Sequence, residues 1–203
     1  TPAPQQTYVY ATIDIRFGPA AKSLRSIEDV PRLTPLPNAD SPVTVFLGMR
    51  RDLKTAVFLV STDVNARGQG KCEPSESDCQ AVELKQNQDV FLDVRASDGT
   101  VTQYELDLVR VTLHETTSKA VAKSAYARAS RAGARWLSQQ AHDSARNTDA
   151  ERPLRIPFRY AAGSGVLHIA PWMSQRLAHG HGAHGAVAHA QAVAGPRASI
   201  GDR

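Results

Sequence analysis

The hydrophobic pattern of the chain is strongest in residues 42–61, where a short polar segment separates two apolar runs. The first run alternates, so that four large side chains share one face of an extended chain: Val43, Val45, Leu47 and Met49. Residues 56–60 are apolar on both faces, as in a strand covered on both sides. A buried helix is the alternative, but each run has the length of a strand and is rich in β-branched and aromatic residues. The pattern therefore predicts a central β-hairpin, connected by residues 50–54.

Shorter alternating runs predict four more strands, in residues 8–17, 81–85, 90–94 and 101–113. Asp98-Gly99 favours a tight turn before the last of them, because it readily supplies the positive φ that such turns require. In that last strand the apolar side chains change face near Leu108-Val109, which indicates a β-bulge or a passage between two sheets. The predicted fold is mainly β, a small antiparallel sandwich or half-barrel of about six strands.

Other segments lack this alternation. Leu24, Ile27 and Val30 lie three residues apart and predict a short helix in residues 20–30, which Pro31 ends. Residues 31–42 are expected to be a Pro-rich connector and residues 61–80 a long loop. Within that loop, Gly68-Gln69-Gly70 lacks the third glycine, the helix and the Lys-Ser/Thr pair of a phosphate-binding loop.

The composition changes at residue 116. Residues 118–140 are Ala-rich and contain five cations and no acid, which predicts a basic helix. Either its few large apolar side chains pack this helix against the sheet, or the helix is only marginally stable on its own. These side chains are Val121, Tyr126, Trp136 and Leu137. Residues 154–160 and 166–169 predict a second, less apolar hairpin that could join the main sheet.

The predicted organisation has five parts. They are an extended N-terminal segment (1–7), a β domain (8–113), a basic Ala-rich helix (114–145), a linker with a hairpin (146–170) and a disordered Ala/Gly/His-rich tail (171–203).

The positive charge of the chain belongs to its C-terminal part. Residues 1–113 carry 12 basic and 15 acidic residues, whereas residues 114–203 carry 12 and 5. The basic helix could bind an anionic membrane surface, a nucleic acid or an acidic partner, or it could simply be solvated, because its cations lie all round it. A nucleic acid is the less expected partner. The candidate polyanion- or partner-binding residues are Lys119, Lys123, Arg128, Arg131 and Arg135.

The two cysteines indicate the compartment. Cys72 and Cys79 lie in a polar loop that bends easily into a closed ring, so a disulfide is expected, with free thiols or half of a zinc site as alternatives. The small, Pro-rich opening TPAPQQT is typical of a chain that follows a removed signal peptide, although a cloning boundary looks the same. No stretch approaches 18 apolar residues. We therefore expect an extracytoplasmic protein, secreted or at the cell surface, without a membrane span in this chain.

Catalytic and metal-binding signatures are absent from the sequence. Gly-x-Ser-x-Gly does not occur, and His114-Glu115 lacks the second histidine of a zincin motif. The tail contains one metal-like run, His179, His181, His184 and His189, but the glycines between the imidazoles leave no preorganised geometry. We expect neither an enzyme nor a cofactor.

Several motifs together resemble secreted or envelope-associated, uncharacterised proteins of actinobacteria. They are the RFGP segment, the VFLG and AVFLVS strands with a lysine-bearing turn between them, the two-Cys loop, and the ELK and VFLDV pair. The likeness covers residues 10–113, and less clearly residues 116–170. More distantly, the strand order is similar to that of small β domains in type IV pilus and type II secretion assemblies. That similarity implies recognition by strand pairing or by a groove, without a cofactor.

These observations predict a non-enzymatic structural or protein-interaction module of the cell envelope, in a setting such as a pilus or secretion assembly. Its partner would be an envelope or extracellular protein, or a second copy of itself. The binding surface would be an exposed sheet edge or the Cys72–Cys79 loop. The alternative function is binding of an anionic polymer or membrane surface through the helix in residues 118–140.

Overall fold

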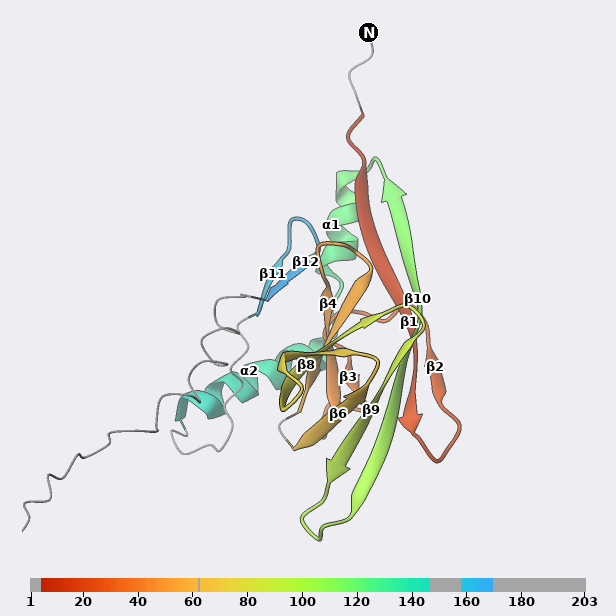
Figure 1. Cartoon of the computed structure of the whole chain (residues 1–203). Helices are drawn as coiled ribbons and strands as arrows, with labels where there is room; N and C mark the ends of the chain where they lie inside the picture. The colour runs from red at the N-terminus through yellow and green to blue at the C-terminus, as the bar shows by residue number, and fades with distance from the viewer. Residues whose placement is uncertain (1–4, 62, 147–157, 170–203) are drawn as a thin grey trace, which may run out of the picture.

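The computed structural model describes residues 5–61, 63–146 and 158–169, with side chains described as far as residue 139 in the second range. It is mainly β, as predicted, with two sheets and two helices (Figure 1). One sheet has the strand order β2 (Arg25–Ile27), β1 (Tyr8–Pro19), β10 (Val101–Thr116), β9 (Gln88–Arg95) and β6 (Val64–Gly68). The other has the order β11 (Phe158–Ala161), β12 (Val166–Ile169), β4 (Thr44–Met49), β5 (Thr55–Val60), β8 (Asp78–Lys85) and β7 (Lys71–Ser75), with β3 (Pro35–Leu36) beside β4.

The main core lies between the two sheets, because each sheet turns one apolar face toward the other. Ile13, Ile15 and Phe17 of β1 are buried there, which confirms the alternation predicted for the first strand. They belong to the same cluster as Phe46 of β4 and Phe58 of β5, whose ring centroids lie 5.3 Å apart. Burial of large apolar side chains at about 25 cal/mol per Å² makes this cluster the main source of stability.

A second apolar cluster covers the other face of the central hairpin. Val57 and Leu59 of β5 are fully buried in it. Trp136 and Leu137 of α2 (Arg131–Arg146) and Leu167 of β12 pack against that face. The prediction that residues 56–60 are covered on both sides is therefore confirmed, and the cover is a helix and a hairpin.

Two β-bulges change which face the side chains occupy. In the pair β1–β10 the register shifts between Asp14 and Ile15, so Val109 has no partner on β1. This confirms the change of face predicted near Leu108-Val109. In β4–β5 the shift lies around Leu47. Leu47 therefore packs with Val45 in the second cluster, whereas Val43 and Met49 belong to the main core. The prediction that these four share one face is wrong, because it assumed unbroken alternation.

Three segments predicted to lack strands contain them, and one of these is the connector in residues 31–42, where β3 lies beside β4. Residues 20–30 form no helix; instead β2 pairs with β1 as a short edge strand. Residues 61–80 are not a loop, because they contain β6, β7 and the start of β8. All three segments lie at or next to sheet edges, where one side of a strand faces water and apolar alternation is not needed. Among the residues described between 8 and 116 there are thus ten strands, rather than about six.

The basic segment forms two helices rather than one. Ser118 caps α1 (Lys119–Ala127), where its side chain accepts a hydrogen bond from the Val121 N–H. The chain is extended at Arg128 and pairs at Ala129 with Arg32 before α2 begins. A Cβ at Gly133 would lie 1.8 Å from the Leu33 carbonyl oxygen, so a glycine is needed where α2 meets this segment. The helix break follows from these contacts with residues 32–33, which sequence periodicity does not show.

The predicted C-terminal hairpin is present and joins the main sheet, since Val166 of β12 pairs in parallel with Met49 of β4. The rest of the predicted outer segments lies outside the described residues: residues 1–4, the linker and strand start in residues 147–157, and the tail from residue 170.

Candidate functional site

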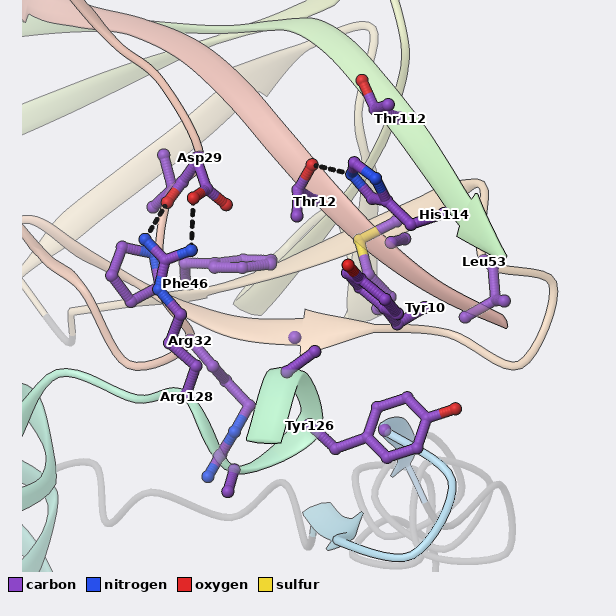
Figure 2. A pocket seen from close by; sticks show the side chains of 18 of the residues that line it. Tyr10, Thr12, Asp29, Arg32, Phe46, Leu53, Thr112, His114, Tyr126 and Arg128 are labelled. Atoms are coloured by element: carbon purple, nitrogen blue, oxygen red, sulfur yellow. Dashed lines mark hydrogen bonds and ion pairs between the residues drawn. The ribbon is translucent and has the colours of Figure 1, made fainter. Parts of the chain in front are cut away.

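A cavity of about 840 Å³ lies beside the first half of β1, between that strand and α1 (Figure 2). Its walls come from β1, residues 28–32, the end of β4 and the turn after it, β10, α1 and the β11–β12 hairpin. We call this cavity the edge groove, because it follows the side of β1 that faces away from β10. Its volume falls in the range of about 300–1,000 Å³ that is usual for binding sites.

The edge of β1 is open at the groove because its neighbour is too short. β2 covers only Ile15–Phe17. Farther along, the Val30 N–H donates to the Ile13 carbonyl (2.9 Å), and the Tyr126 hydroxyl donates to the Val9 carbonyl (2.8 Å). Backbone groups of alternate residues in an antiparallel strand point the same way, so the N–H and C=O of Ala11 also point away from β10. Ala11 lines the groove, and no described residue hydrogen-bonds to its backbone from that side.

The strand edge separates two kinds of wall. On the core side of β1, the groove is lined by Phe46, Met49 and Leu53, which are apolar. On the outer side it is lined by the side chains of Tyr10 and Thr12, and by those of β10 opposite them. A strand added to this edge would send its side chains alternately toward the apolar wall and the polar wall.

The polar wall is held together by contacts across the β1–β10 pair. The Tyr10 and His114 rings are stacked with centroids 4.8 Å apart, and Thr12 Oγ1 lies 3.0 Å from His114 Nε2 (Figure 2). These contacts fix the orientation of all three side chains. An aromatic and hydrogen-bonding surface is thus preorganised along one side of the edge.

Tyr126 of α1 ties three elements together at the end of the groove. Its ring is buried, its hydroxyl donates to β1, and its carbonyl accepts a hydrogen bond from the Tyr160 hydroxyl (2.5 Å). A Cβ at Gly165 would lie 2.2 Å from Tyr126 Cδ1, so the tyrosine ring requires glycine there. Burial raises the pKa of Tyr126, which keeps its hydroxyl protonated as the donor to Val9.

Arg32 is a half-buried charged side chain on the groove wall, and it has no ionic partner among the described residues. Its guanidinium carbon lies 3.8 Å above the centroid of the Tyr160 ring, a cation–π geometry. Its Nε is buried without a hydrogen-bond partner. Burial lowers the pKa of Arg32, and the nearby Tyr160 opposes that shift. Burial also raises the pKa of Tyr160, and here Arg32 opposes it.

Two groove-lining acids, by contrast, already have partners. The Asp14 carboxylate accepts from the Asp29 N–H (2.9 Å) and forms an ion pair with Arg110 (3.6 Å). The Asp29 carboxylate forms an ion pair with Arg128, which also donates to the Asp29 carbonyl (2.9 Å; Figure 2). These contacts join residues 28–32 to β1 and to the break between the two helices. They shape the groove and leave Arg32 without a counter-ion.

The five cations predicted to bind a polyanion do not form one basic helix face. Lys119 and Lys123 lie on α1, Arg131 and Arg135 on α2, and Arg128 in the break between them. All five are exposed, but Arg128 is engaged with Asp29. The tail histidines His179, His181, His184 and His189 lie outside the described residues, and the described part of the chain has no group of three or more His, Cys, Asp or Glu placed to hold a metal ion.

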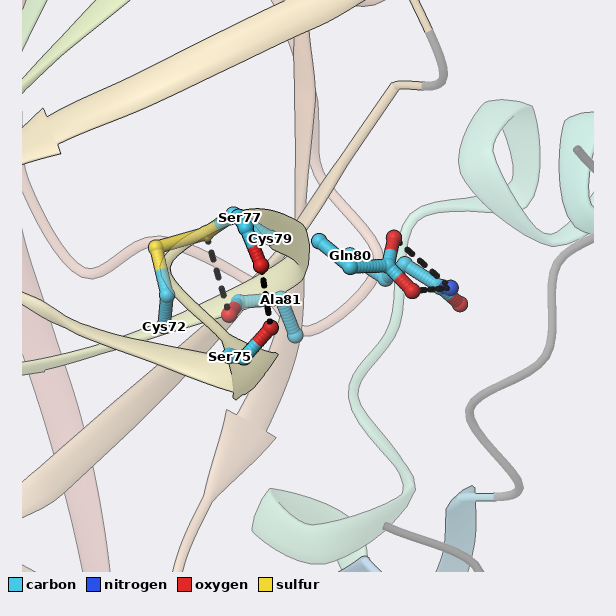
Figure 3. The surroundings of a disulfide bond; sticks show 7 residues. Cys72, Ser75, Ser77, Cys79, Gln80 and Ala81 are labelled. Carbon is cyan, nitrogen blue, oxygen red and sulfur yellow. Dashed lines mark hydrogen bonds between the residues drawn. A yellow bond between two sulfur atoms is a disulfide. The ribbon is translucent and has the colours of Figure 1, made fainter. Parts of the chain in front are cut away.

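Cys72 and Cys79 are joined by a disulfide, with their Cα atoms 5.0 Å apart (Figure 3). The bond links β7 to β8, whose turn also brings the hydroxyls of Ser75 and Ser77 to within 3.1 Å. Cys79 is buried, and Cys72 packs against the main core. The predicted pairing is present, but it fastens a β-hairpin rather than a loop, and none of these residues lines the edge groove.

The edge groove itself was missed by sequence reasoning. Arg32 lies in the Pro-rich connector, Tyr126 in the basic segment and Tyr160 in the C-terminal hairpin, far apart in the chain. No local pattern joins residues at such separations. The sequence predicted an exposed sheet edge as a candidate binding surface, but it did not indicate which edge.

Comparisons of the chain with models of protein families, with curated proteins and with solved structures found no match. Within the described residues, neither helix has the length and apolar character that crossing a membrane requires.

Removing the disulfide should destabilise the protein without changing its strand content. We expect Cys72→Ser with Cys79→Ser to lower the free energy of unfolding by about 2–2.5 kcal/mol, because closing so short a ring restricts the unfolded chain. Thermal unfolding followed by circular dichroism should show a melting temperature lower by roughly 5–10 °C. Wild-type protein with reductant is the matched control, and an unchanged melting temperature in both samples would contradict the structural role.

The open edge predicts different tolerance to proline at two neighbouring positions. Ala11→Pro should change the free energy of unfolding by about 1 kcal/mol or less, because its N–H faces the groove. Thr12→Pro should cost several times as much, because it removes a hydrogen bond to β10. Thr12→Val is the control, because it removes the side-chain hydroxyl and keeps the backbone N–H. Equal destabilisation by the two prolines in urea unfolding would show that the edge is not open at Ala11.

Proposed function

We propose that the protein is a non-enzymatic interaction module that binds an extended segment of a partner by strand addition in the edge groove. The observation that carries this proposal is the unpaired backbone of Ala11 inside a preformed cavity. Strand addition gives affinity through main-chain hydrogen bonds and specificity through pockets for alternate side chains. The groove offers both, since its apolar and polar walls lie on opposite sides of the edge.

The available edge sets the length of the partner segment. From Val9 to Ile13 the strand has five residues, which span about 17 Å at roughly 3.4 Å per residue. The open edge ends where the Tyr126 hydroxyl donates to the Val9 carbonyl and where the Val30 N–H donates to the Ile13 carbonyl. The segment that pairs directly with β1 therefore has about three to five residues, and flanking residues would contact α1 and the end of β4.

The setting we propose is extracytoplasmic, at the cell envelope. The Cys72–Cys79 disulfide supports it, because disulfides persist in oxidising compartments. Within the envelope, a pilus or secretion assembly is the setting that the sequence resemblance suggests. That resemblance implies recognition by strand pairing or by a groove, which is the mode of binding proposed here.

The second candidate is binding of an anionic polymer or membrane surface by the exposed cations of the two helices. The observation in its favour is that Lys119, Lys123, Arg131 and Arg135 are exposed and that α1 and α2 contain no acid in their first turns. The helix break and the Asp29 contact of Arg128 argue for the groove instead. Binding that weakens steeply as the salt concentration rises would favour this second candidate.

Site-specific photocrosslinking tests where the partner binds. Val121 lines the groove and is 48% exposed, whereas Val101 lies outside it and is 51% exposed. We replace each in turn with a photoreactive phenylalanine analogue and irradiate the protein in the envelope fraction of the producing cells. We expect Val121 to capture one partner protein through one short segment, and Val101 not to capture it.

The proline variant supplies the second control. Ala11→Pro blocks strand pairing, so it should abolish capture at position 121 while the protein remains folded by circular dichroism. Capture that is equal at the two valine positions, or that is unaffected by Ala11→Pro, would contradict strand addition. Capture of no protein at position 121 would contradict the proposed function as a whole.

A further inference from the structure

The Arg32 side chain differs from the other arginines in the described residues. It is half-buried and lines the groove, yet it has no carboxylate partner. Arg50 is also half-buried, but it pairs with Glu83 (3.3 Å). The remaining arginines whose side chains are described are exposed, so water solvates those that have no ion pair. Arg32 is therefore a partly desolvated cation without a counter-ion.

Such a group is costly to keep unless something compensates it. Removing a charge from water is unfavourable when no opposite charge or hydrogen bond replaces the lost solvation. The Tyr160 ring at 3.8 Å supplies part of the compensation. It leaves the Nε–H of the guanidinium shielded from solvent and without a hydrogen-bond partner. A planar anion with two oxygens matches this donor geometry.

None of the described acids that line the groove supplies that anion. Of the three acids that line the groove, Asp14 is held by Arg110 and the Asp29 N–H, and Asp29 is held by Arg128. Glu28 is exposed, and it has no contact with Arg32 in the structure. A carboxylate that reaches Arg32 would therefore come from the molecule that occupies the groove.

We propose that the occupant of the edge groove is an extended peptide of a partner protein that places a carboxylate on the Arg32 guanidinium. This inference rests on the proposed function and adds the chemistry of its ligand. A small free anion would compensate Arg32 but would leave the backbone of Ala11 and the apolar wall uncovered. A peptide with an acidic side chain or a free C-terminus satisfies all three features at once.

The size of the effect follows from the strength of charge-assisted hydrogen bonds. Such bonds contribute about 1.5–3 kcal/mol, which corresponds to roughly 10- to 150-fold in affinity. Arg32→Gln should therefore weaken binding of a carboxylate-bearing peptide by at least about tenfold. Arg32→Lys should recover part of the affinity, because it keeps the charge and loses the two-pronged geometry.

The test uses a synthetic array of decapeptides of varied sequence, presented with a free or an amidated C-terminus, and the full chain as probe. Fluorescence anisotropy then measures the dissociation constants of the strongest peptides for wild-type protein and for Arg32→Gln and Arg32→Lys. Arg159→Gln is the matched control, since Arg159 is an exposed neighbour of Tyr160 that does not line the groove. Melting temperatures verify that each variant is folded.

We expect the binding peptides to share one carboxylate position, and expect Arg32→Gln, but not Arg159→Gln, to weaken them at least tenfold. Replacing that carboxylate by an amide in the peptide should have the same effect. The amide replacement changes only the peptide, so it tests the role of the carboxylate even if the Arg32→Gln variant does not fold. Ala11→Pro should abolish binding of the same peptides.

Three results would overturn the inference. If peptides compete for the groove but bind equally well without the carboxylate or without Arg32, the carboxylate proposal fails and strand addition stands. If acetate alone binds as tightly as the peptides, and Ala11→Pro has no effect, the site takes a small anion and not a peptide. If no peptide binds and Val121 captures no partner, the inference fails together with the proposed function.

Discussion

The constraint that shapes this molecule is the mismatch in length between two neighbouring strands. β1 has 12 residues, but β2 covers only three of them. Backbone N–H and C=O groups at a sheet edge need partners, and an uncovered edge tends to recruit another strand. The protein covers this edge by single contacts, from Val30 and from Tyr126, and leaves the backbone of Ala11 between them open to the groove. The cavity, its walls and its proposed ligand all follow from that mismatch.

The contacts that close the ends of the groove also connect the two sheets to the helices. Tyr126 reaches β1 through its hydroxyl and the β11–β12 hairpin through its carbonyl. The segment around Arg32 pairs with Ala129 in the helix break, and β12 pairs with β4. Because these elements support one another, the groove is already formed before a ligand binds, and its residues do not need to fold on binding. Preformed sites lose less conformational entropy when they bind.

Sequence patterns predicted the parts of the fold that depend on local alternation. The central hairpin, the long strand with its bulge at Val109 and the C-terminal hairpin each carry apolar runs of strand length, and each is present. The edge strands β6 and β7 were missed because strands at an edge do not need that pattern. β7 even contains Pro74, which an edge strand tolerates.

The sequence predicted the general type of binding surface, but not its position or its residues. The two cysteines pointed to a disulfide, which is present, and an exposed sheet edge was predicted as a binding surface without a position in the chain. The groove depends instead on contacts between distant segments, such as Arg32 on Tyr160 and Gly165 against Tyr126. The single basic helix was wrong for the same reason. Good helix formers run through residues 118–140, but the hydrogen bond from the Ser130 N–H to the Arg32 carbonyl stops the first helix.

Hydrogen exchange of the Ala11 amide, measured by NMR on the free protein, tests the open edge most directly. The amide of Thr12 pairs with β10 and should exchange slowly, only when the strand pair opens. The Ala11 amide faces the groove, and we expect it to exchange much faster than that of Thr12, and to become protected when a partner peptide is bound. An Ala11 amide that is as protected as Thr12 in the free protein would contradict the open edge, and with it strand addition as the mode of binding.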